Sequence, residues 1–271
     1  MIGMGGSFRH GKVLAVAGSL PQARTAVVTG AASPRGIGRA TADRLARDGW
    51  AVAVLDVDGA GADLVAAEIT AAHSVATLGV AVDVADEASV DAAIARVEAG
   101  LPPIVGLANV AGVASPVPFL DVTPAEWDRV FGVNTRGTFL VTRRVVPAMI
   151  AQGVGRIVSV SSASAQTGGG VYSRVPYSAA KAAVIGFGRA LARELAPHAI
   201  TVNNVTPGPI DTDIMGGTLT DERKAEVSAG TLLRRVGTPD EVAALIAFLC
   251  SADAGYITAA TYDINGGLHM S

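Results

Sequence analysis

Tyr177 and Lys181 lie four positions apart in a stretch that predicts a helix, so their side chains share one helix face. A lysine ammonium beside a phenol stabilises the phenolate and lowers the pKa of the tyrosine, which suits acid–base chemistry on an alcohol or a carbonyl. Ser161-Ser162 and Ser164 follow the preceding apolar run, where a hydroxyl can bind the reacting oxygen. The Tyr-x-x-x-Lys spacing also occurs by chance on surface helices. The nearby serines are the reason to interpret it as a catalytic pair here.

A glycine-rich segment follows the first apolar run and precedes a helical pattern. Its residues Gly30, Gly36 and Gly38 permit a tight turn and let a pyrophosphate approach the backbone N–H groups of a helix N-terminus, where the helix dipole favours an anion. Asp56 ends the next apolar run, 18 positions after Gly38, where a carboxylate can accept hydrogen bonds from ribose hydroxyls. Together these features predict a dinucleotide site, and the less favoured alternative for Asp56 is a turn residue at a strand end.

The elements that must position these residues alternate along the chain. Short apolar runs without polar alternation predict strands of a parallel sheet covered on both faces, at Thr25–Thr29, Ala51–Leu55, Ala76–Val82, Ile104–Ala108, Arg156–Ser161, Thr201–Val205 and Thr261–Ile264. Helical patterns separate them, at Ile37–Asp48, Ala60–Ala72, Ala88–Ala99, Pro124–Ala151, Pro176–Leu195 and Pro239–Ser251. This alternation predicts an α/β fold with one doubly wound, seven-stranded parallel sheet.

Composition limits the classes of function. The 271 residues are 50% hydrophobic and 17% charged, which excludes disorder as the main state, and the net charge of −3 shows no basic surplus for nucleic acid. No apolar stretch reaches membrane-spanning length, and the N-terminus lacks a signal-peptide pattern, so we expect a cytoplasmic protein. The single Cys250 is interpreted as a buried structural thiol, and the four scattered histidines predict no metal site. Residues 1–24 are interpreted as a tail and residues 25–271 as one domain.

Taken together, these motifs resemble the short-chain dehydrogenase/reductase family over nearly everything from Thr25 to Gly267. The matching residues, in order, are Thr29, Gly30, Gly36 and Gly38; Asp83-Val84; Asn109-Val110-Ala111-Gly112; Asn134; Ser162, Tyr177 and Lys181; Pro207-Gly208 with Ile210 and Thr212; Gly237-Thr238-Pro239; and Asp263–Gly267. Two departures stand out. Pro34-Arg35 lengthens the glycine-rich loop, and Val110 replaces the second asparagine of an Asn-Asn-Ala-Gly motif.

The resemblance implies a Rossmann fold and hydride transfer between a nicotinamide cofactor and a secondary alcohol or ketone. It assigns Tyr177 as the acid–base residue, Ser162 as the group that binds the reacting oxygen, Lys181 as the residue that tunes Tyr177, and Asn134 as the holder of a relay water. Ser162 is preferred over Ser164, although Ser164 has the commoner separation from the tyrosine. The implied cofactor-binding residues are Gly30, Ser33, Arg35, Gly36, Ile37, Gly38, Asp56, Val57, Asp83, Val84, Asn109, Ala111, Gly112, Tyr177, Lys181, Pro207, Gly208, Ile210 and Thr212.

The preferred cofactor and the substrate are inferred from fewer residues. Asp56 disfavours a 2′-phosphate and so favours NAD over NADP, whereas Arg35 occupies a place where NADP-using relatives often carry a basic residue; its other interpretations are a solvent-facing side chain or a partner of Asp56. We expect a small or polar substrate such as a sugar or polyol, beneath a lid at about residues 213–233 with a Gly216-Gly217 hinge. The alternatives are a 3-oxoacyl-carrier-protein reductase and a non-catalytic dinucleotide sensor. Relatives of this length are usually homotetramers, and we expect that assembly, with a dimer as the alternative, because a helix that is apolar over more than one face needs a second partner. The stretch Tyr262–Met270 is also apolar and glycine-rich, which suits contact with a neighbouring subunit. The apolar residues beyond one core-facing stripe of the helices at 124–151 and 176–195 are Val141, Val145, Val146, Met149, Ile150, Ala183, Val184, Phe187, Ala190 and Leu191.

Overall fold

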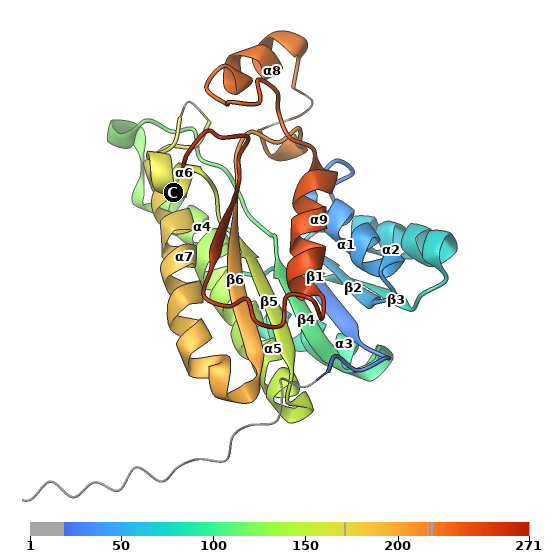
Figure 1. Ribbon diagram of the computed structural model, residues 1–271. Coiled ribbons are helices and arrows are strands. Elements are labelled where there is room, and N and C mark those ends of the chain that lie inside the picture. Colours follow the sequence, from blue (N-terminus) through green and yellow to red (C-terminus); the bar gives the residue numbers. More distant parts are fainter. Residues whose placement is uncertain (1–18, 171, 216, 218, 271) are drawn as a thin grey trace, which may run out of the picture.

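The computed structural model describes residues 19–170, 172–215, 217 and 219–270, which leaves out most of the predicted tail and Gly216 of the predicted hinge. Seven strands form one parallel sheet in the order β3-β2-β1-β4-β5-β6-β7 (Figure 1). They are β1 (Thr25–Thr29), β2 (Ala51–Asp56), β3 (Thr77–Ala81), β4 (Ile104–Asn109), β5 (Gly155–Val160), β6 (Ile200–Pro207) and β7 (Thr261–Ile264). The prediction of a doubly wound α/β Rossmann fold is confirmed.

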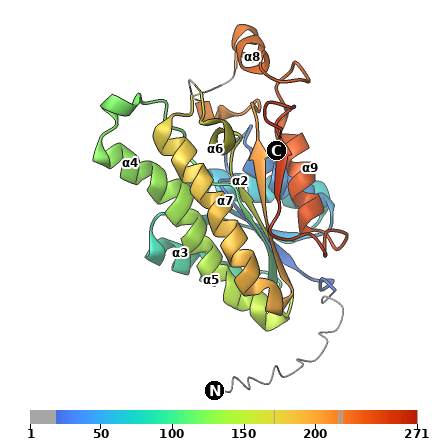
Figure 2. The same ribbon diagram turned by 60° about the vertical axis from the view of Figure 1, so that its left-hand side comes forward.

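Helices cover both faces of the sheet. One face carries α1 (Ile37–Arg47), α2 (Gly59–His73) and α9 (Pro239–Cys250), and the other carries α3 (Glu87–Gly100), α4 (Pro124–Phe131), α5 (Gly137–Gln152) and α7 (Val175–Leu195), which come forward in Figure 2. The short elements are η1 (Phe119–Asp121), η2 (Gly132–Arg136), α6 (Ser164–Thr167), η3 (Ala196–His198), η4 (Asp213–Met215) and α8 (Asp221–Ser228).

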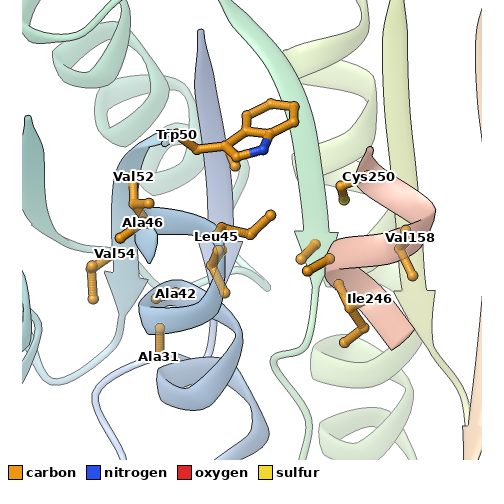
Figure 3. Packing of buried hydrophobic residues seen from close by; sticks show 14 of the residues in the cluster. Ala31, Ala42, Leu45, Ala46, Trp50, Val52, Val54, Val158, Ile246 and Cys250 are labelled. Carbon is orange, nitrogen blue, oxygen red and sulfur yellow. The ribbon is translucent and has the colours of Figure 1, made fainter. Parts of the chain in front are cut away.

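Burial on both faces explains the uninterrupted apolar runs of the central strands. Every residue of β1, β4, β5 and β6 is buried, as expected for a parallel sheet between two helical layers. On the α1/α9 side the core joins Leu45 and Trp50 to Ile246 and Cys250, so the lone thiol is a packing residue (Figure 3). Small residues such as Ala42 and Ala46 keep α1 close to the sheet.

The predicted helix Pro124–Ala151 is wrong as one continuous element. The structure divides it into α4, a π-helical turn η2 and α5. The apolar pattern runs through all three pieces, so periodicity alone does not reveal the widened turn. This turn places the buried Asn134 beside the loop that follows β4.

Among the described helices, none has both the length and the apolar character needed to cross a membrane. The described residues also contain no group of three or more histidine, cysteine, aspartate or glutamate side chains arranged to hold a metal ion.

Candidate functional site

A cavity of about 950 Å³ opens at the carboxyl ends of the strands. It lies beside β1, which pairs with β2 on one side and with β4 on the other. The chain crosses over in opposite directions on the two sides of β1. Ligands of doubly wound sheets usually bind at such a point of reversal. Its volume is at the upper end of the range of about 300–1,000 Å³ for cofactor and ligand pockets. The cavity therefore has room for a dinucleotide together with a small substrate.

The glycine-rich loop forms one end of this cavity. Gly30 has φ +67°, and a Cβ there would lie 2.7 Å from the Cα of Ala111, so a larger residue would push the two loops apart. Gly36 is the N-cap of α1 and supplies no side-chain cap, so the N–H groups of the first helical turn stay open to a ligand. Gly36, Ile37 and Gly38 all line the cavity. These features fit a pyrophosphate at the helix N-terminus.

Asp56 stands at the end of β2 and also lines the cavity. Its carboxylate accepts a hydrogen bond from the N–H of Ala32 at 2.9 Å and another from the N–H of Asp58 at 3.1 Å. These bonds fix the carboxylate beside the glycine-rich loop, as a ribose-binding acid requires. Val57, Asp83 and Val84 line the same end.

Arg35 is not among the residues that line this cavity. Its guanidinium forms an ion pair with Asp211 and lies 3.9 Å from a carboxylate oxygen of Asp213. The structure thus joins Arg35 to the segment after β6, a partner that the sequence did not predict. Ser33 does line the cavity, and its hydroxyl donates a hydrogen bond to Asp213 at 3.2 Å.

Ser162, Tyr177 and Lys181 come together at the other end of the cavity. Ser162 follows β5, and its hydroxyl interacts with the Tyr177 phenol. The Lys181 ammonium donates to the Val160 carbonyl at 2.9 Å and lies 5.8 Å from the centroid of the Tyr177 ring. Helix α7 carries both residues, and the Ser161 hydroxyl ties it to β5 through the Lys181 carbonyl at 2.7 Å.

The second candidate serine is engaged elsewhere. The hydroxyls of Ser164 and Ser173 are 2.7 Å apart, so Ser164 holds the loop after α6 against its own helix. Its backbone N–H donates to the Ser162 hydroxyl at 3.1 Å, which orients Ser162 toward Tyr177. Both serines line the cavity, but Ser162 is the one whose hydroxyl interacts with the phenol.

Burial is the main cause of the pKa shifts of Tyr177 and Lys181. It raises the pKa of Tyr177, an effect that the hydrogen bond from Ser162 partly offsets. Burial also lowers the pKa of Lys181 to about 8. The net direction for the pKa of Tyr177 is opposite to the expectation from sequence that a neighbouring lysine lowers it, because burial penalises the charged phenolate.

Two predicted site residues stand behind the cavity wall instead of in it. Asn134 is fully buried in η2; its amide donates to the carbonyls of Val130 and Val113, and its oxygen accepts from the Val113 N–H. Asn109 is buried under α5, where its amide donates to Thr142 and Ser159. Asn134 therefore positions the loop that carries Gly112 and Val113, and Asn109 connects β4 to β5 and α5.

The remaining predicted residues, Ala111, Gly112, Pro207, Gly208, Ile210 and Thr212, all line the cavity. The structure adds residues that motif matching missed: Arg129 from α4, Glu226 and Val227 from α8, and Leu268 near the C-terminus. Glu226 and Val227 fall within the predicted lid, whereas no sequence signal marked Arg129 or Leu268. Tyr172 and Arg223 join the loop after α6 to α8 through a 2.5 Å hydrogen bond and a guanidinium stacked 4.1 Å from the ring centroid.

Comparison with known proteins agrees with this geometry. A family model described as enoyl-(acyl carrier protein) reductase matches residues 30–269. An uncharacterized short-chain type dehydrogenase/reductase of Sinorhizobium fredii is 42% identical over 249 residues, covering 92% of this chain and 98% of the relative. The 3-oxoacyl-[acyl-carrier-protein] reductase of Aquifex aeolicus is 40% identical over 247 residues (91% and 98%), and the acetoacetyl-CoA reductase of Allochromatium vinosum is 37% identical over 251 residues (92% and 99%).

Proposed function

This chain belongs to the short-chain dehydrogenase/reductase family and is an oxidoreductase; on that premise we propose that it transfers hydride between NAD and a secondary alcohol or ketone. One observation carries the proposal. Ser162, Tyr177 and Lys181 line the same cavity as the open N-terminus of α1 and Asp56. Acid–base groups and a dinucleotide cradle therefore share one space.

Side chains of this chain transfer the proton and stabilise the charge on the reacting oxygen. When bound, the nicotinamide cofactor accepts or supplies the hydride. Tyr177 exchanges a proton with the substrate oxygen, while Ser162 donates a hydrogen bond to that oxygen and stabilises charge developing on it. Lys181 supplies positive charge beneath the phenol, and its bond to Val160 holds it there. Asn134 acts on the site by holding Val113 in place.

Cofactor preference rests on Asp56. Its carboxylate is fixed at the ribose end of the cavity, where a 2′-phosphate would suffer repulsion of about 1–3 kcal/mol. Arg35, the cation that would counter this repulsion, is directed to Asp211 and Asp213. This arrangement supports NAD as the preferred cofactor.

Two substrate classes have support. Small and polar residues of α6 and of the loop after it contribute much of the substrate end, which favours a small or polar alcohol such as a sugar or polyol. They are Ser164, Thr167, Gly169, Gly170 and Ser173. The second candidate is a 3-oxoacyl thioester, because the Aquifex aeolicus and Allochromatium vinosum relatives are named as reductases of that chemistry.

The test combines binding and turnover. Calorimetric titration should show tighter binding of NADH than of NADPH, and a panel of sugars, polyols and 3-oxoacyl thioesters should identify the substrate class. Tyr177→Phe should lower kcat by about two to four powers of ten while NADH affinity stays near wild type. Tighter binding of NADPH would contradict the cofactor assignment, and an active Tyr177→Phe enzyme would contradict the role of the phenol.

A further inference from the structure

Arg35, one of the two extra residues of the glycine-rich loop, reaches across the cofactor cleft. Arg35 pairs with Asp211 and approaches Asp213, and the neighbouring Ser33 hydroxyl also bonds Asp213. The loop follows β1, whereas the two aspartates follow β6, more than 170 positions later in the chain. These contacts therefore connect opposite walls of the cleft.

A second cation completes the connection. The Lys224 ammonium of α8 lies 2.8 Å from the other carboxylate oxygen of Asp211. Asp211 thus lies between Arg35 of the cofactor loop and Lys224 of the predicted lid. All three side chains are only partly exposed, at 33% for Arg35, 24% for Asp211 and 32% for Lys224, so solvent screens these pairs less than it screens fully exposed ones.

The position of this bridge relative to the cavity gives it a role. Ile210 and Thr212, on either side of Asp211, line the cavity, as do Gly36 and Ile37 directly after Arg35. The bridge therefore crosses the cleft next to the N-terminus of α1, where the pyrophosphate is proposed to bind. We propose that Arg35, Asp211 and Lys224 form a clasp that closes over the bound dinucleotide, slows its release and couples α8 to cofactor occupancy.

This inference rests on the proposed function, and it differs from a simpler role for Arg35 as a direct ligand of the cofactor phosphates. If Arg35 bound phosphate, Asp211 would compete for it, and neutralising Asp211 would slow NADH release. If the clasp holds the cofactor, neutralising either member speeds release, because breaking the pair frees both walls of the cleft. The two roles thus predict opposite effects for Asp211→Asn.

Stopped-flow displacement of NADH by excess NAD, followed by NADH fluorescence, measures the release rate directly. We expect Arg35→Gln and Asp211→Asn each to raise the release rate about 3- to 30-fold. The release rate of the double variant should exceed that of the faster single variant by less than about twofold, because both substitutions break the same ion pair. Lys224→Gln should raise the rate by a smaller factor. Arg39→Gln is the matched control, since Arg39 has similar exposure and forms an ion pair with Glu68 of α2, not with the segment after β6.

Each outcome decides between the alternatives. Slower release from Asp211→Asn, or equal rates in Arg35→Gln and Arg39→Gln with unchanged Tm, would overturn the clasp while leaving the proposed function intact. Failure of the wild-type protein to bind NADH would overturn the proposed function, and the clasp with it.

Discussion

The two candidate serines differ in what their hydroxyls contact. The sequence favours Ser162 by its position after the strand, although Ser164 has the commoner separation from Tyr177. The structure separates them through contacts that no spacing encodes: Ser162 contacts the phenol and Ser164 contacts Ser173. The glycines at 168–170 lengthen the loop enough for both arrangements.

We therefore expect Ser162→Ala to lower kcat by about two to three powers of ten, through loss of a donor to the reacting oxygen. Ser164→Ala should change kcat by less than about fivefold, because its hydroxyl holds a loop. Steady-state kinetics of both variants check this, with NADH affinity as the control for folding. The reverse order of the two effects would exchange the roles of the serines.

Burial of the Lys181 ammonium destabilises the folded state. Its pKa is lowered to about 8 by burial, so below pH 8 it is charged in both the folded and unfolded states, and folding must bury that charge. Between pH 8 and the unfolded value near 10.5 the folded state releases the proton while the unfolded state keeps it, so stability rises with pH.

Lys181→Met should therefore raise the free energy of unfolding at pH 7 by about 1–3 kcal/mol while abolishing activity. The excess over wild type should shrink between pH 8 and pH 10. Urea denaturation across this range measures it, and an excess that does not change with pH would show that packing, not charge, is the cause.

At the scale of elements, uniform patterns were predictable and interrupted ones were not. The strands are located by sequence to within one or two residues because continuous apolar runs mark burial on both faces. The π turn η2 escapes detection because it inserts into an otherwise regular pattern, and α8 escapes because its mostly polar, exposed sequence has little apolar periodicity. The missed cavity residues Glu226 and Val227 belong to that helix.

Helix α9 begins with a proline and a capping box. Pro239 occupies its first turn, and Thr238 and Glu241 form reciprocal side-chain and backbone hydrogen bonds. Hydrogen bonds from Arg235 are the main reason that the pKa of Glu241 is lowered to about 2, and the Thr238 N–H adds to the effect. The carboxylate therefore stabilises α9 at every pH above about 4.5, and this stabilisation is lost as the pH falls toward 2.

Glu241→Gln should lower the free energy of unfolding by about 0.5–1 kcal/mol at pH 7, a modest effect because the side chain is 42% exposed. The difference from wild type should disappear as the pH falls from 4.5 toward 2. Thermal unfolding across this range is the measurement, and Asp240→Asn is the neighbouring control. An equal loss in both variants would point to the helix dipole instead of the cap.

At the scale of the whole molecule, apolar surface on α5 and α7 favours assembly, although not through all the residues that the sequence indicated. Val141, Val145, Met149 and Val184 are buried in the chain's own core, so their assignment to an outer face is wrong. Phe139 remains 42% exposed and Ile150 38% exposed, and Phe139 meets the ring of Phe187 edge to face, with centroids 6.5 Å apart. The C-terminal stretch is divided too: Tyr262 and Ile264 pack on the core, while Met270 is exposed.

We predict a homotetramer built on this α5/α7 surface. Light scattering coupled to size exclusion should give about four times the chain mass of 27.2 kDa at micromolar concentration. Phe139→Glu should reduce the mass, because burying a carboxylate in a subunit interface is costly. A dimer in the wild type would contradict the tetramer, and a monomer would show that the exposed rings have no partner.

The strand order also constrains how the chain is synthesised and folds. Strands β1, β2 and β3 can pair as soon as they leave the ribosome, but one side of β1 waits for β4, whose partner residue Ile104 is 79 positions beyond Thr25. Until then β1, all of whose residues are buried in the folded chain, presents an unpaired edge, the kind that recruits other chains. Because the cofactor cavity lies at this late junction and its far wall follows β6, a nascent or truncated chain cannot use a dinucleotide to stabilise itself. Aggregation during expression should therefore depend on translation speed between β1 and β4 more than on added cofactor.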